Sequence, residues 1–99
     1  MSFRLSAKAK SDLENIARFT LNSWGREQRN FYLKQLDEAF HALADSPTLG
    51  MPCDYIKPGY RKFPQGSHVV YYRSGSETDI EIIRVLHKNM DLELNLNAP

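Results

Sequence analysis

The chain contains a single cysteine, Cys53, so it can form no internal disulfide and no multi-cysteine metal site. Its three histidines are scattered without the spacing of a zinc site, and we expect neither a metal nor a cofactor. No apolar run approaches the roughly 20 residues that span a bilayer, and the beginning "MSFRLSAKAK" lacks the apolar stretch of a secretion signal. These absences predict a cytoplasmic protein without a membrane partner.

Excess charge of either sign is also absent. Lys and Arg together number 13 against 12 for Asp and Glu, a net charge of +1. Attraction to phosphates therefore cannot dominate binding, and we expect no direct sequence-specific contact with nucleic acid. Motifs of catalysis are missing too, since no glycine-rich phosphate loop, carboxylate pair or nucleophile elbow appears.

What remains is an ordinary globular composition of 41% hydrophobic and 25% charged residues in 99 residues, enough for one domain spanning residues 1–99. Helical spacing begins after Ser6, a plausible N-cap, although Ser11 with Glu14 also fits a capping box. Gly25 is expected to end this helix, and Pro47 a second one. Two adjacent helices predict an antiparallel hairpin. The inward positions are Leu13, Ile16, Ala17, Thr20, Leu21 and Trp24, then Tyr32, Leu36, Ala39, Phe40 and Leu43.

Strand-like alternation surrounds the hairpin. It occurs in "FRLS" at the start and again in residues 60–63, 68–73 and 80–87, which are separated by short polar turns. The segment "SPTLGMPCDYIKPG" predicts a loop, in which Cys53 is expected to be a surface or half-buried thiol rather than a nucleophile. We therefore predict an α+β fold: an N-terminal strand, a helical hairpin packed on a mostly antiparallel sheet, and a short C-terminal tail.

Both faces of the predicted sheet are apolar. Val69 and Tyr71 share one face while Val70 and Tyr72 share the other. The last strand divides in the same way, with Ile80, Ile82 and Leu86 on one side and Ile83 and Val85 on the other. One hairpin covers one face, so the second must be covered by the tail at residues 90–96 or by another protein. The simpler alternative is that the sheet twists and the tail packs over it. "DLELNL" in this tail suits a strand, and a short helix from Lys88 is also possible.

The stretch "RVLHKNMDL" poses the question of catalysis. Arg84 and His87 lie three positions apart, so in a regular strand they point to opposite faces and share no cleft. A metal-independent ribonuclease needs a base, and arginine is a poor one. His87 is therefore better explained as a strand-end residue. Arg61, His68, Arg73, Arg84 and the tyrosines could still be recruited to such a site, with a histidine as the base. The simpler interpretation is that Arg61 and Arg73 are solvated strand charges and that Tyr71 and Tyr72 are core or sheet aromatics.

The segments "WGREQRNFYLKQLDEAF", "GYRKFPQGSHVVYYR" and "IEIIRVLHKNMDL" together resemble the ParE toxins of the RelE/ParE superfamily, over nearly the whole chain. The resemblance implies the toxin of a type II toxin–antitoxin module, which inhibits DNA gyrase by binding rather than by catalysis. It also implies a ParD-type antitoxin that neutralises the toxin.

The alternative is the RelE type, which shares the fold and cleaves messenger RNA on the ribosome. Arg61 and Arg84 match its basic cluster, but the tail has no tyrosine and only one lysine, Lys88. The tail also departs from the usual ParE ending, because Met90 stands where many members carry a basic residue.

The resemblance and the two apolar faces together predict two contact sets. An antitoxin segment that folds on binding is expected to cover apolar side chains that the chain cannot cover alone. Trp24 is central to this set, although a tryptophan here could instead anchor the hairpin. The antitoxin set is Leu21, Trp24, Arg61, Val70, Tyr72 and Arg73. The gyrase set, at the end of the last strand and the start of the tail, is Arg84, His87, Lys88 and Met90.

Overall fold

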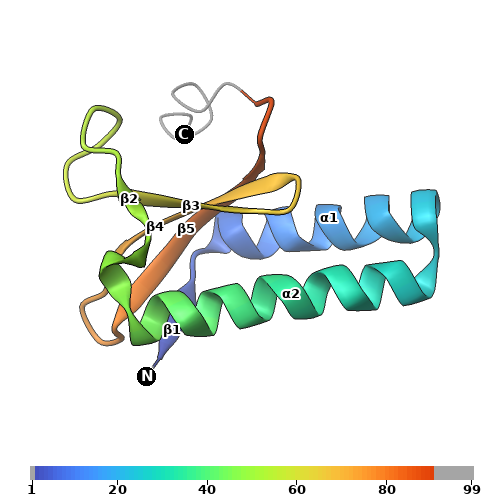
Figure 1. The fold of residues 1–99 in the computed structure, drawn as a ribbon, viewed down its shortest axis with the longest axis horizontal. Helices are drawn as coiled ribbons and strands as arrows, with labels where there is room; N and C mark the ends of the chain where they lie inside the picture. The colour runs from blue at the N-terminus through green and yellow to red at the C-terminus, as the bar shows by residue number, and fades with distance from the viewer. Residues whose placement is uncertain (1, 91–99) are drawn as a thin grey trace.

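The computed structural model describes residues 2–90, and the predictions for the tail beyond Met90 lie outside this range. The chain folds as a strand, a helical hairpin, and then a run of strands (Figure 1). The elements are β1 (Phe3–Leu5), α1 (Ala7–Trp24), α2 (Arg26–Asp45), the 3-10 helix η1 (Pro47–Leu49), β2 (Met51–Pro52), β3 (Arg61–Gln65), β4 (His68–Ser74) and β5 (Ile80–His87).

The two helices form the predicted antiparallel hairpin. Ser6 caps α1, because its side-chain oxygen accepts a hydrogen bond from the Ala9 N–H at 3.0 Å, so the alternative start at Ser11 is wrong. Gly25 ends α1 with a φ of 93°, a conformation that favours glycine, and α2 begins at the next residue. The tip of the hairpin extends beyond the sheet (Figure 1). Within residues 2–90, no helix has the length and apolar character needed to cross a membrane.

The five strands form one sheet in the order β1-β5-β4-β3-β2. β1 pairs with β5 in parallel, and the other three pairings are antiparallel. The α+β class and the mostly antiparallel sheet are thus confirmed. The predicted loop after α2 contains two elements that the sequence did not reveal, η1 and the two-residue strand β2.

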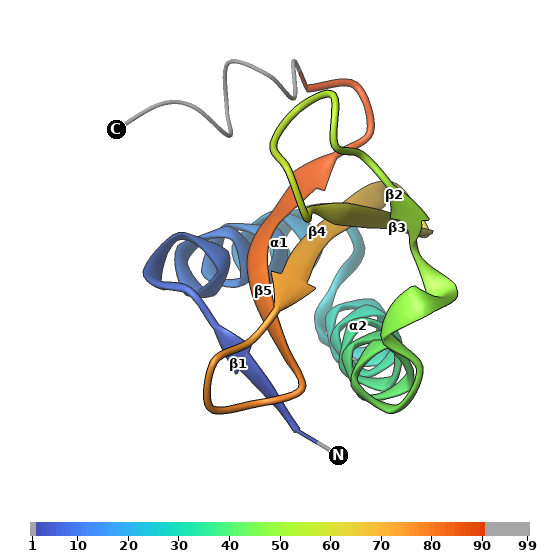
Figure 2. The same ribbon diagram turned by 90° about the vertical axis from the view of Figure 1, so that its left-hand side faces the viewer.

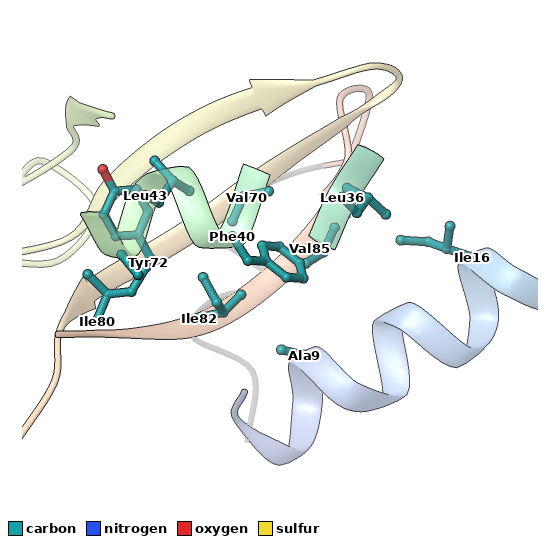
Figure 3. Packing of buried hydrophobic residues seen from close by; sticks show 11 residues of the cluster. Ala9, Ile16, Leu36, Phe40, Leu43, Val70, Tyr72, Ile80, Ile82 and Val85 are labelled. Atoms are coloured by element: carbon teal, nitrogen blue, oxygen red, sulfur yellow. The ribbon is translucent and has the colours of Figure 1, made fainter. Parts of the chain in front are cut away.

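The main core lies between the helical hairpin and one face of the sheet (Figures 2 and 3). Val70 and Tyr72 are in this core, with exposed fractions of 0% and 1%. The expectation that they lie on an uncovered face is therefore wrong, since the hairpin itself covers them. Other members of the core are Ala9, Ile16, Leu36, Phe40, Leu43, Ala44, Ile80, Ile82 and Val85.

A β-bulge in β5 changes the predicted faces of this strand. Tyr72 pairs with Ile82 and Tyr71 pairs with Arg84. Ile83 is therefore an extra residue in β5, without a partner opposite it in β4. The inserted residue shifts the alternation that follows it. Val85 therefore joins the helix-covered core with Ile82, while Leu86 faces the opposite side. Their predicted sides were wrong for this reason.

The second face of the sheet carries a smaller apolar cluster of Cys53, Tyr71 and Leu86. The loop between β2 and β3 contributes Cys53, and Ile56 and Tyr60 from the same loop pack against the cluster. The prediction that only the tail or another protein could cover this face is wrong, because this loop supplies cover. Cys53 is 0% exposed, so the prediction of a surface or half-buried thiol was wrong as well.

Candidate binding groove

A groove of about 580 Å³ runs between the helical hairpin and the end of β5. We call it the hairpin groove. One wall is α1, the start of α2 contributes at the tip, and the opposite wall comes from the β3–β4 turn and the end of β5. Its lining includes Asp12, Ile16, Phe19, Thr20, Trp24, Tyr32, Ser67, His68, Val85, His87 and Met90.

The helical wall of the hairpin groove is built by sequence spacing. Asp12, Ile16, Thr20 and Trp24 recur every four residues and therefore form one row along α1. Ile16 and Thr20 are buried at the bottom, whereas Trp24 is 72% exposed at the end of the row. Trp24 is thus not a core anchor of the hairpin. Together with the exposed Phe19, it gives the groove an aromatic rim of the type that binds partners.

A polar cluster forms the sheet wall of the hairpin groove. His68 and His87 pair directly across β4 and β5, and their ring centroids lie 5.6 Å apart in an edge-on arrangement. The hydroxyl of Tyr32 on α2 lies 2.5 Å from Nδ1 of His68. Burial lowers the pKa of His68, and proximity to His87 lowers it further, against a raising effect of Asp12. Burial raises the pKa of Tyr32. Both groups therefore favour their neutral forms.

The β3–β4 turn closes over Tyr32 and holds this cluster in place. The Tyr32 hydroxyl accepts a hydrogen bond from the Ser67 N–H and lies within donating distance of the Gln65 carbonyl, both at 3.2 Å. Gly66 between them has a φ of 60°, and a Cβ there would come within 2.7 Å of the Tyr32 ring. Only glycine fits this turn without displacing the tyrosine.

A second polar contact joins the two walls of the groove. The Asp12 carboxylate on α1 accepts hydrogen bonds from Nε and Nη2 of Arg84 at 2.8 and 2.9 Å, and from the Val85 N–H at 3.0 Å. The side chains of Arg84 and Asp12 are only 14% and 11% exposed. The hydrogen bond to Asp12 also raises the pKa of Arg84. We call this contact the Asp12–Arg84 clamp, because it fixes α1 against β5.

The predicted antitoxin residues are dispersed in the structure. Trp24 lines the hairpin groove, while Leu21 is exposed on α1 and is not part of the lining. Arg61 donates a hydrogen bond to the Gly50 carbonyl at 2.7 Å, and Arg73 forms an ion pair with Glu81 at 2.8 Å. With Val70 and Tyr72 in the core, these six residues do not form one surface.

The predicted gyrase residues are closer together. His87 and Met90 both line the hairpin groove, and Lys88 is exposed between them along the chain. Arg84 is held in the Asp12–Arg84 clamp instead, so a partner could reach its guanidinium only by competing with Asp12. Phe19 and Tyr32 are groove residues that neither predicted set contained. Phe19 lies off the predicted inward face, and an apolar residue at such a position is a sequence signal of a binding surface.

The groove combines an apolar wall with the Tyr32, His68 and His87 side chains. Within residues 2–90 no three His, Cys, Asp or Glu side chains are grouped so that they could hold a metal ion. Cys53, the one thiol, lies in the cluster on the opposite face of the sheet, and burial raises its pKa.

Comparison with known proteins identifies the family of the chain. Residues 3–92 match the family described as the ParE toxin of the type II toxin–antitoxin system, parDE. Toxin ParE1 of Mycobacterium tuberculosis is 43% identical over 94 residues, which cover 95% of this chain and 96% of that protein. Toxin ParE1 of Caulobacter vibrioides is 40% identical with the same coverage. The protein is therefore a toxin of a type II toxin–antitoxin system. More particularly, the chain belongs to the ParE toxin family, a family of toxins rather than of catalytic enzymes.

The fold is shared with a solved structure as well. A chain in the structure described as the chromosomal ParDE TA system from P. aeruginosa superimposes with a TM-score of 0.72 at 21% sequence identity. The similarity covers 88% of this chain and 95% of that chain. The helical hairpin on a five-stranded sheet is thus an architecture that this chain shares with a known component of such a system.

Proposed function

We propose that this chain poisons DNA gyrase by binding it in the cytoplasm, and that a ParD-type antitoxin neutralises the poison. The observation that carries the proposal is the family match across residues 3–92, supported by relatives at 40 to 43% identity. A binding mechanism is consistent with the hairpin groove, which has an exposed aromatic rim. The antitoxin is the partner that the family name implies.

In this proposal the antitoxin inserts an apolar segment into the hairpin groove, with Trp24 as the main anchor. Exposed aromatic side chains at the rim of a groove supply much of the affinity in such interfaces. Leu21 extends the contact along the tip of the hairpin. Arg61 and Arg73 lie on the far strands and pair with antitoxin carboxylates at the periphery, where each contributes little.

Gyrase is proposed to contact His87, Lys88 and Met90, while Arg84 keeps the end of β5 in position through the clamp. His87 and Met90 line the same groove as Trp24. An antitoxin anchored on Trp24 would therefore cover residues that gyrase needs. Neutralisation then follows from direct competition for one surface.

The decisive experiment pairs two assays on the purified toxin. Gyrase supercoiling should be inhibited, and added ParD-type antitoxin should restore it, while messenger RNA on ribosomes stays intact. Cleavage of messenger RNA with normal supercoiling would contradict the proposal and indicate the RelE type of activity.

A matched pair of variants tests the groove. Trp24→Ala should weaken antitoxin binding by about 2 kcal/mol, or roughly 30-fold in Kd. Phe31→Ala removes another exposed aromatic side chain of the hairpin that does not line the groove, and should leave Kd unchanged. Isothermal titration calorimetry measures both. Equal losses in the two variants would place the antitoxin elsewhere on the hairpin.

A further inference from the structure

The histidine pair in the hairpin groove has no role so far in antitoxin binding, although His87 is assigned to the proposed gyrase contact. His68 and His87 face each other across neighbouring strands, and both line the groove that also holds Trp24. The remaining histidine, His41, lies on α2 outside this lining and is within 3.5 Å of Asp37. Two imidazoles at this separation repel each other if both carry a proton. Their charge state therefore alters the wall of the groove.

His68 can change its charge without breaking its hydrogen bonds. When its imidazole is neutral, the Tyr32 hydroxyl donates its one proton to Nδ1 of His68. When His68 is protonated, Nδ1–H becomes the donor and Tyr32 the acceptor, and the Tyr32 proton turns to the Gln65 carbonyl, which lies 3.2 Å away. The Ser67 N–H still bonds the Tyr32 oxygen in both states. The network is thus satisfied in either form.

Each element around His68 presents a group that affects its charge. Tyr32 comes from α2, His87 from β5 and Asp12 from α1. The Asp12 carboxylate already forms the clamp with Arg84, so its charge is largely compensated. Burial and His87 both oppose protonation, and the pKa of His68 is lowered overall. Covering the groove with an apolar segment would remove the remaining water and oppose protonation further.

We propose that His68 and His87 make occupation of the hairpin groove depend on pH: the groove accepts an apolar antitoxin segment when both imidazoles are neutral, and protonation of His68 weakens that binding. The inference rests on the proposed function, because it assumes that the antitoxin enters this groove. The bound complex holds fewer protons than the free toxin. By linkage, acidification therefore favours release of the toxin.

The test begins with the free toxin. Titration of the three imidazole Cε1–H resonances by NMR gives the pKa of each histidine, and His68 should titrate below the ordinary value of about 6.5. The Kd for a ParD-type antitoxin is then measured above and below that pKa. For the wild-type chain it should rise toward a limit of about tenfold per pH unit below the pKa of His68.

Two variants isolate the contribution of the pair. His68→Asn offers an oxygen near the place of Nδ1 and cannot be protonated, so the acid-induced rise in Kd, measured relative to the same variant's own Kd near neutral pH, should be lost. His41→Asn is the matched control and should retain the wild-type pH dependence. Titrating groups of the antitoxin itself contribute equally to all three proteins, so they cancel in the comparison.

Several results would overturn the inference. One is a His68→Asn variant with the wild-type pH dependence, and another is binding that strengthens on acidification. A His68 that stays neutral throughout the folded range would do so as well. The failure of the proposed function looks different, since the antitoxin would then not bind at any pH, or would bind without sensitivity to Trp24→Ala.

Discussion

Removal of the Asp12 carboxylate should destabilise the protein more than removal of Glu14, the other acidic side chain of α1. Asp12→Ala deletes three hydrogen bonds at 2.8 to 3.0 Å. It also removes the carboxylate that compensates the largely buried guanidinium of Arg84, and leaves the Val85 N–H without its acceptor. Loss of one partner from a fully buried ion pair costs roughly 3–5 kcal/mol.

The side chains of Asp12 and Arg84 are 11% and 14% exposed, so the pair is not fully buried. We therefore expect a loss of stability at the lower end of this range, about 3 kcal/mol. That is a large part of the roughly 5–15 kcal/mol by which domains are stable. In urea unfolding, with a slope of about 1–2 kcal/mol per molar for a chain of this size, the midpoint should fall by roughly 2 M. Glu14→Ala on an exposed position of the same helix should change stability by less than about 0.5 kcal/mol.

The double variant Asp12→Ala with Arg84→Met separates the ion pair from other effects. It should recover part of the lost stability, because the arginine charge is no longer left without its carboxylate. A cost below about 1 kcal/mol for Asp12→Ala, or a cost that is the same with and without Arg84, would refute the role assigned to the clamp.

Three further predictions concern buried or conformationally restricted groups. Tyr72→Phe should lower the free energy of unfolding in urea by about 2 kcal/mol. The Tyr72 hydroxyl donates to the Pro47 carbonyl and accepts from the Gly50 N–H, and these two backbone groups would lose their partner. An unchanged free energy of unfolding would contradict this. Cys53 should resist a thiol reagent such as DTNB until the chain unfolds, because it is fully buried and its pKa is raised by burial; rapid labelling of native protein would show that the loop over it opens. Gly25→Ala should lower stability by about 1 kcal/mol. The loss comes from the φ of 93° alone, because no atom lies within 4 Å of the added Cβ. An unchanged melting temperature would argue against backbone strain at this position.

Much of the fold could be predicted from local sequence. Ser6 and Gly25 delimit α1 because capping and positive φ depend on the residue itself and its near neighbours. The strand at residues 80–87 was predicted with its observed bounds. Such features are encoded within a few residues, so periodicity and turn chemistry are sufficient to find them.

Features that depend on distant partners could not be predicted in the same way. Strand alternation separates two faces but does not say which one the helices cover, so Val70 and Tyr72 were assigned to the wrong side. The bulge at Ile83 then reversed the faces of Val85 and Leu86. Nothing local in the sequence indicates an unpaired residue within an apolar run.

The candidate groove illustrates the same limit. Trp24 and His87 were singled out as separate candidates, but only the folded chain brings them to one groove. Tyr32 meets His68 across 36 positions of sequence, a contact that no spacing rule describes.

The place of β5 in the sheet sets the order in which activity can arise during translation. β5 is the last of the described elements to leave the ribosome, yet it lies between β1 and β4 and supplies Arg84 to the clamp and His87 to the groove. Until it emerges, β1 has no neighbouring strand and Asp12 has no arginine partner. The long chain segment that separates β1 and α1 from β5 therefore cannot yet be closed into a loop by these contacts. A nascent chain that stops short of Ile80 therefore lacks the central strand, the Asp12–Arg84 clamp and the His87 side of the hairpin groove. We expect toxicity to arise only after the codons of β5 have been read.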